Sequence, residues 1–269
     1  MLGPQEPTAM GHARLGDSLP NTRPWRKVVG HIADGVGAAG VAQATAEAAG
    51  AALNAAQRDP AMARIVFLLA KTVLAAREED FCAELERHGI RVPSSPSIYD
   101  LTAGFSDAFH EWHSTSRVLR TDFGEMAELA ATEAMTRCAN ERSLQLIPTG
   151  DELQNAFRAL STPKGFSRLA HEFFARFTQR FLHFHLDREL PHHMGGNGRF
   201  PDRKARNEFV EDLETHCREA ALIVKQYSAD WFSKANFEDG ITESRAKIFS
   251  QTCIKKLRKE LLIRGVQYV

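Results

Sequence analysis

The sequence predicts an all-α protein, folded as an irregular multi-helix bundle around one central aromatic helix. Apolar residues recur at three- and four-residue intervals through most of the chain after residue 60, which is the period of a helix with one buried face. No run of alternating β-branched residues indicates a strand, and short segments with Pro, Gly or Ser separate the periodic ones. With 269 residues, of which 43% are hydrophobic, the chain is long enough to bury a sizeable core.

Residues 1–24 are predicted to be a disordered lead. Four prolines stand among polar residues there, without the apolar stretch that is typical of a signal peptide. The four cysteines of the chain lie far apart in segments predicted as helical, which is typical of small buried thiols in a reducing compartment. We therefore expect a cytoplasmic protein.

Residues 25–93 are predicted to form an Ala/Gly-rich helical hairpin. Small residues recur at three- and four-residue steps, at Gly30, Ala33, Gly37, Gly40 and Ala44. Such a face allows another helix to approach closely, either inside the fold or as a docking surface for a partner. Polar residues interrupt the stretch too often for a membrane span, so no membrane association is expected. Asp59 and Pro60 then begin a longer helix that ends at Gly89.

Residues 97–269 are predicted to be the main helical bundle, after a short linker rich in Ser and Pro. Three helix starts follow from local capping patterns, in which a side chain accepts a hydrogen bond from the amides of the first turn. The pairs are Ser97 with Asp100, Asp122 with Glu125, and Thr149 with Glu152. Apolar residues at helical spacing follow each of them.

The central aromatic helix is predicted to begin at Thr162 and Pro163 and to end before Pro191. One broad face of it carries Phe166, Phe173, Phe177, Phe181 and Phe184. A fully buried Phe contributes on the order of 1.5 to 3 kcal/mol, so this helix is expected to contribute most to the core. Arg180 and Asp187 lie one turn before and after His183, a spacing typical of a solvated polar edge.

Two helices are predicted after this segment, over residues 202–234 and 242–264. Acidic and basic residues balance at 34 each over the whole chain, so the protein has no net positive charge that would attract nucleic acid. The last helix is locally basic, and Lys255, Lys256 and Lys259 are its candidate nucleic-acid contacts. The competing interpretation is a solvated basic face whose lysines complement the helix dipole.

No catalytic motif is present, and neither a P-loop nor a dinucleotide-binding pattern occurs. His183 and His185 are two residues apart, which places them about 160° apart on a helix and prevents a shared metal. A composite metal site is the alternative that distant segments could assemble. Its candidate ligands are His113, His185, Glu189, His192, His193 and His216. Our main expectation is no catalytic residue, no metal and no cofactor.

Two other features are candidate interaction sites. The loop after the aromatic helix could present backbone amides and a guanidinium to an anion, or be an ordinary glycine turn. Its candidate residues are His192, His193, Gly196 and Arg199. Trp231 and Phe232 lie near the end of the following helix, with Phe232 off the apolar stripe, as expected of interface anchors.

The stretch from RELPHHMGGNGRF through HCREAALIVKQYSADWFSKANFEDGIT resembles uncharacterised bacterial helical proteins encoded in multi-gene phage-defence operons. The resemblance covers about the last third of the chain and implies an accessory subunit working with an enzyme encoded elsewhere. No site residue follows from it.

The sequence therefore predicts a non-enzymatic accessory or scaffold subunit of a multi-protein bacterial system, acting by protein–protein interaction. Two alternatives stay open. One is a metal-dependent hydrolase that uses the scattered histidines, and the other is a nucleic-acid-binding protein that uses the basic last helix.

Overall fold

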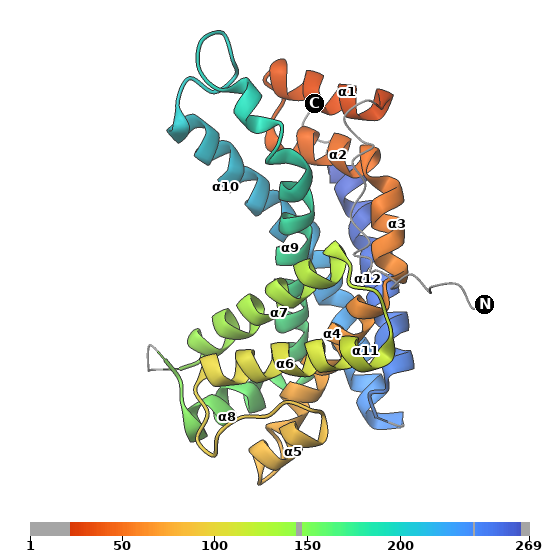
Figure 1. Cartoon of the computed structure of the whole chain (residues 1–269), viewed down its shortest axis with the longest axis vertical. Helices are drawn as coiled ribbons and strands as arrows, with labels where there is room; N and C mark the ends of the chain where they lie inside the picture. Colours follow the sequence, from red (N-terminus) through yellow and green to blue (C-terminus); the bar gives the residue numbers. More distant parts are fainter. Residues whose placement is uncertain (1–21, 144–146, 239, 265–269) are drawn as a thin grey trace, which may run out of the picture.

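The structure is a computed structural model that describes residues 22–143, 147–238 and 240–264 (Figure 1). Most of the predicted lead, residues 1–21, lies outside the described residues, and the first helix begins at Arg23, inside the end of that range. None of the helices formed by the described residues combines the length and the apolar composition that a membrane span requires.

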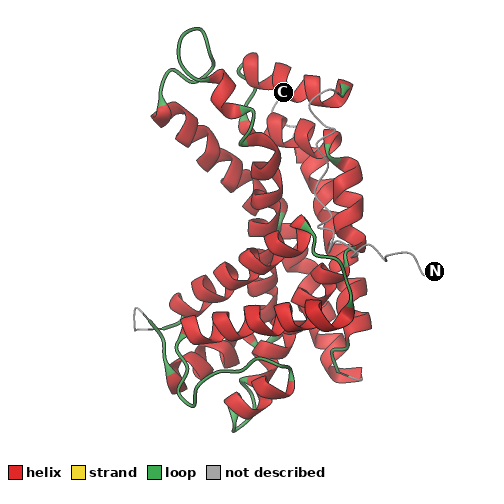
Figure 2. Ribbon diagram, in the orientation of Figure 1, coloured by secondary structure: helices red, strands yellow, loops and turns green. Residues whose placement is uncertain are grey.

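The described chain is an all-α bundle, as predicted (Figure 2). Its helices are α1 (Arg23–Ala33), α2 (Ala38–Ala48), α3 (Gly50–Arg58), α4 (Pro60–Ala75), α5 (Phe81–Arg87), α6 (Ile98–Ser116), α7 (Asp122–Asn140), α8 (Gly150–Leu160), α9 (Pro163–Leu186), the short 3₁₀ helix η1 (Leu190–His193), α10 (Arg203–Ala220), α11 (Leu222–Glu238) and α12 (Glu243–Arg264). Over these residues no strand forms, and isolated bridges join Ser97 to Thr149 and Met194 to Phe200.

The range 25–93 is not a simple hairpin, because it contains α1 to α5. Its buried residues, such as Val28 and Leu53, belong to the same hydrophobic core as Phe174 and Phe249 from the later helices. Short helices of small residues have too little apolar surface to be stable alone. They are instead stabilised by α12, which packs against α2, α3 and α4.

Of the three predicted capping pairs, one forms as expected. Thr149 does stand at the N-cap of α8, but its side chain makes no capping hydrogen bond. Ser97 and Asp100 form the expected capping box of α6, and the Asp59 carboxylate accepts a 2.8 Å hydrogen bond from the Ala61 amide at the start of α4. The cap of α7 is Thr121, one residue earlier than the predicted Asp122, and its hydroxyl accepts from the Gly124 amide. Thr121 also donates to Asp59 at 2.6 Å, so the starts of α4 and α7 are tied together.

Helix α9 is the central helix of the fold (Figure 1). It packs against α7, α8, α10, α11 and α2. Its phenylalanines at 166, 173, 177 and 181 are buried as predicted, while Phe184 of the same face is half-buried. Ala175 and Leu186, on the opposite side of the helix, are buried as well. Neighbouring helices therefore cover more of its circumference than the single predicted face.

The predicted helix over residues 202–234 is divided at Ala221 into α10 and α11. Neither proline nor glycine marks this break, since the local sequence is CREAALIVK. Both Ala220 and Ala221 are buried, and the chain turns there so that α11 can pack along α9 and α12. Helical periodicity continues across the break, which is why the pattern did not predict it.

Candidate binding groove

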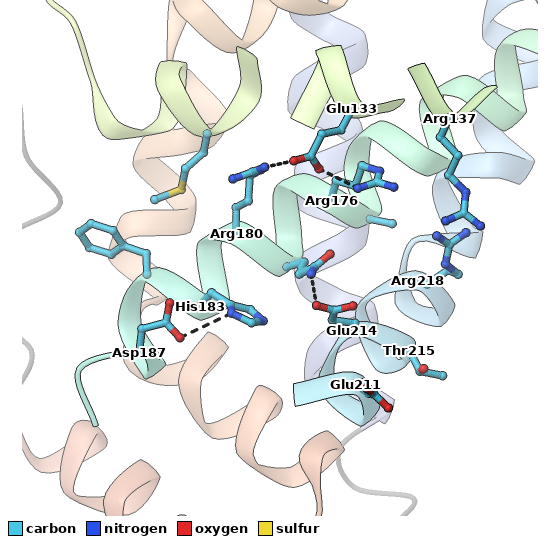
Figure 3. Close-up of a pocket in the computed structure, with 14 residues that line it drawn as sticks. Glu133, Arg137, Arg176, Arg180, His183, Asp187, Glu211, Glu214, Thr215 and Arg218 are labelled. Carbon is cyan, nitrogen blue, oxygen red and sulfur yellow. Dashed lines mark hydrogen bonds and ion pairs between the residues drawn. The ribbon is translucent and has the colours of Figure 1, made fainter. Parts of the chain in front are cut away.

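A pocket of about 860 Å³ lies between α7, α9 and α10 (Figure 3). Pockets of this size are typical of ligand-binding sites. Unlike most of them, it is lined largely by charged side chains of both signs. We call it the groove.

The floor of the groove is the polar edge of α9. Arg176, Gln179, Arg180, His183 and Asp187 recur there at three- and four-residue steps, so they share one side of the helix. His183 Nδ1 lies 3.5 Å from Asp187, as its spacing predicts. The predicted polar edge is therefore confirmed, and α7 and α10 flank it to make a concave site.

The α7 side of the groove carries Glu133 and Arg137. The Glu133 carboxylate binds two arginines of the floor, with Arg176 Nη1 at 2.7 Å and Arg180 on its other oxygen (Figure 3). These contacts hold α7 against α9 through charge-assisted hydrogen bonds.

Glu172 of α9 is the buried centre of the ion-pair network, with only 5% of its surface exposed. Arg218 of α10 contacts both of its carboxylate oxygens, and Arg137 Nε of α7 lies 3.5 Å from Oε2. A buried carboxylate requires such partners, because desolvation strongly disfavours an unpaired charge. Glu172 thus joins the three helices that form the groove.

Toward the N-terminus of α10 the groove is acidic. Glu214 and Glu211 lie one and two turns before Arg218, and Asp187 follows the last residue of α9. Glu214 accepts a hydrogen bond from the Gln179 side chain. The groove therefore has an end rich in arginine and an end rich in carboxylates. Such an arrangement suits a ligand that carries both charges, and it repels an extended chain of one sign.

Thr215 carries the one hydroxyl group among the described residues that line the groove. Among the described residues that line the groove there is neither serine nor cysteine, the usual nucleophiles. No group of three or more His, Cys, Asp or Glu within the described ranges lies close enough to hold a metal ion.

The histidines proposed for a composite metal site lie in different environments. His113 of α6 packs edge-on against Phe109 and Trp112, and His185 of α9 packs against Phe181 and Trp25. Burial lowers the pKa of His113 and of His216, and it lowers the pKa of His185 to about 4. These imidazoles are neutral side chains of the packed interior.

The loop predicted as an interaction site does not line the groove. His193 pairs with Glu189 at 3.1 Å, while His192 and Gly196 are exposed and Gly196 has a φ of +50°. Arg199 donates to the Val36 carbonyl at 2.6 Å and lies over the rings of Phe200 and Phe209. Its guanidinium therefore holds the loop against the turn between α1 and α2.

The expectation that Phe232 is an exposed anchor is wrong. Phe232 is 1% exposed and stacks on Phe166 with ring centroids 4.3 Å apart. Trp231 is half-buried and stacks on Phe249. Both side chains face α9 and α12 because α11 is enclosed between them, so they belong to the core and its edge.

The lysines of α12 have different surroundings. Lys255 and Lys259 are exposed one turn apart, whereas the Lys256 ammonium lies over the Tyr227 ring at 5.5 Å. Arg258 and Arg264 of the same helix contact Asn54 and Glu219. The basic face is therefore narrower than the sequence indicates.

The fold and the groove together define an all-α protein with a charged, concave pocket. Comparison of the chain with protein-family models, with curated proteins and with solved structures finds no match. Any function inferred for the groove therefore rests on the residues that line it.

Proposed function

We propose that the protein is a non-catalytic accessory subunit that binds a protein partner through the groove. The observation that carries this proposal is the pair of oppositely charged ends, Arg137 with Arg218 and Glu211 with Glu214, in one concave site. The resemblance of the last third of the chain supports placing this subunit in a multi-protein bacterial system, such as one for phage defence.

A protein partner fits the groove better than a nucleic acid does. The four arginines and four carboxylates that line it balance in charge. Nucleic-acid binding is dominated by cationic contacts with phosphates, and the carboxylates at one end would repel a phosphate backbone. A protein surface can supply an acidic group for one end and a basic group for the other.

Quantitative co-purification from the native host tests this function. Glu211→Lys reverses one charge at the acidic end, on an exposed position of α10, and should lower the yield of the specific partner about fivefold or more. Glu86→Lys makes the same change on the exposed surface of α5, outside the groove, and should leave the yield unchanged. The proposal fails if both variants recover the same proteins in wild-type amounts.

Nucleic-acid contact through α12 is the second candidate, and the exposed pair Lys255 and Lys259 favours it. The double variant Lys255→Glu/Lys259→Glu should then abolish a salt-sensitive gel shift while leaving the packed Lys256 in place. An unchanged gel shift would remove this candidate.

A further inference from the structure

Three guanidinium groups from three helices meet at the basic end of the groove. They belong to Arg137 of α7, Arg176 of α9 and Arg218 of α10. Their nearest nitrogens lie 3.5, 4.0 and 3.1 Å from the same atom, Oε2 of Glu172. Because that carboxylate is buried, it holds the three cations close together before any ligand binds.

The network around this point has more cations than anions. Its ion pairs join five arginines, Arg137, Arg168, Arg176, Arg180 and Arg218, to three glutamates, Glu133, Glu141 and Glu172. Five positive and three negative charges leave an excess of two positive charges. An oxyanion placed at this end would reduce that excess.

The arginines are also accessible from the groove. The side chain of Arg137 is 43% exposed and that of Arg218 is 39% exposed, and they point toward one another across the pocket (Figure 3). Both contacts of Arg137 with Glu141 and Glu172 use Nε. Its two terminal nitrogens are therefore not committed to these carboxylates and can donate to a ligand.

We propose that this end of the groove is an oxyanion subsite, formed by Arg137, Arg176 and Arg218, for a single phosphate or carboxylate group. Planar guanidinium groups match the oxygens of both groups. The carboxylates of Asp187, Glu211 and Glu214 at the other end disfavour a second anion, so the anionic part of the ligand is small and local. This inference rests on the proposed function, since it names the chemical group of the partner that the basic end receives.

Titration of the full chain with inorganic phosphate at low salt, followed by amide NMR shifts, tests the subsite. Wild-type protein should show saturable shifts confined to α7, α9 and α10 around the three arginines. Arg137→Gln should weaken binding about tenfold, because it removes one charge-assisted partner. Arg87→Gln makes the same change on the exposed surface of α5 and should bind as wild type.

A parallel titration with acetate distinguishes the two sources of the oxyanion. Saturation by phosphate alone assigns the subsite to phosphorylated ligands, and saturation by acetate as well admits carboxylates. No saturable shift with either anion overturns the inference, and so does equal binding by Arg137→Gln and Arg87→Gln. If Arg137→Gln does not fold, the wild-type shift map decides, because shifts centred elsewhere exclude this site.

The anion titration and the partner co-purification together distinguish failure of the subsite from failure of the proposed function. Partner binding that depends on Glu211, without phosphate or acetate binding, removes only the subsite. Anion binding by a chain whose partner yield is indifferent to Glu211→Lys removes the proposed function and keeps the subsite.

Discussion

Glu172 is a buried carboxylate directly before two phenylalanines, in the local sequence HEFF. A charged residue inside an apolar helical stretch is rarely buried without a partner. The position of Glu172 is therefore a sequence signal for an ion-pair site, although the sequence does not identify Arg218, 46 residues away, as the partner. Glu172 therefore stabilises the packing of the three helices and also holds the arginines that line the groove in place.

Arg218→Ala should destabilise the protein by about 1 to 3 kcal/mol, because the Glu172 carboxylate stays buried with weaker partners. Adding Glu172→Gln should restore part of the loss, since a neutral amide is easier to bury than an unpaired charge. Urea unfolding measures both changes. If the double variant is as unstable as the sum of the two single variants, the coupling between these residues is absent.

Alanine substitutions at glycines in two helices should change the stability of the protein in opposite directions. A Cβ on Gly165, in the first turn of α9, would lie 2.3 Å from the Ala159 carbonyl oxygen, whereas one on Gly30 of α1 would meet open space. Gly165→Ala should destabilise the protein by about 1 to 3 kcal/mol through this clash. Gly30→Ala should stabilise it by about 0.5 to 1 kcal/mol, because alanine favours a helix. Melting temperatures that shift in the same direction would contradict the packing of α9 on α8.

Helix α1 packs on α9 partly through Trp25 and His185, whose ring centroids are 6.2 Å apart. Burial, together with Arg188, lowers the pKa of His185 from 6.5 to about 4. The unfolded chain therefore binds a proton more readily than the folded one between these two values. Stability that is fully present above pH 6.5 is lost as the pH falls toward 4.

His185→Phe should reduce this acid sensitivity. The lowering of the His185 pKa from 6.5 to about 4 corresponds to about 3 kcal/mol of stability between pH 7 and 4, and phenylalanine cannot bind the proton. Urea unfolding at pH 7 and pH 4.5 measures the difference. Burial also lowers the pKa values of three other histidines, His113, His171 and His216. The stability of the variant should therefore still fall with decreasing pH, but less steeply than that of the wild type. An unchanged slope would mean that His185 does not contribute.

For the whole molecule, the continuous core predicts one cooperative unfolding transition. The three tryptophans report on separate elements, with Trp25 in α1, Trp112 in α6 and Trp231 in α11. Variants that keep one tryptophan and replace the others with phenylalanine should share one urea midpoint with the circular dichroism signal. A lower urea midpoint for the variant that keeps only Trp25 would instead support an N-terminal unit that unfolds separately.

The fold class and many helix starts were predictable because their causes are local. A cap such as Ser97 or Asp59 acts within its own first turn, and the phenylalanines of α9 repeat at helical spacing. The division at Ala221 was not predictable in this way, because packing against α9 and α12 favours it and no local residue marks it. The burial of Phe232 was missed for the same reason.

Local sequence patterns specify an all-α chain, its capped helices and the polar edge of α9 at Arg180, His183 and Asp187. That α7 and α10 flank this edge, and that Arg137 and Arg218 converge on Glu172, follows from tertiary packing. The difference arises because helix formation depends on neighbours within a few residues. The groove depends instead on charges from three helices, which come together only when the common core is packed.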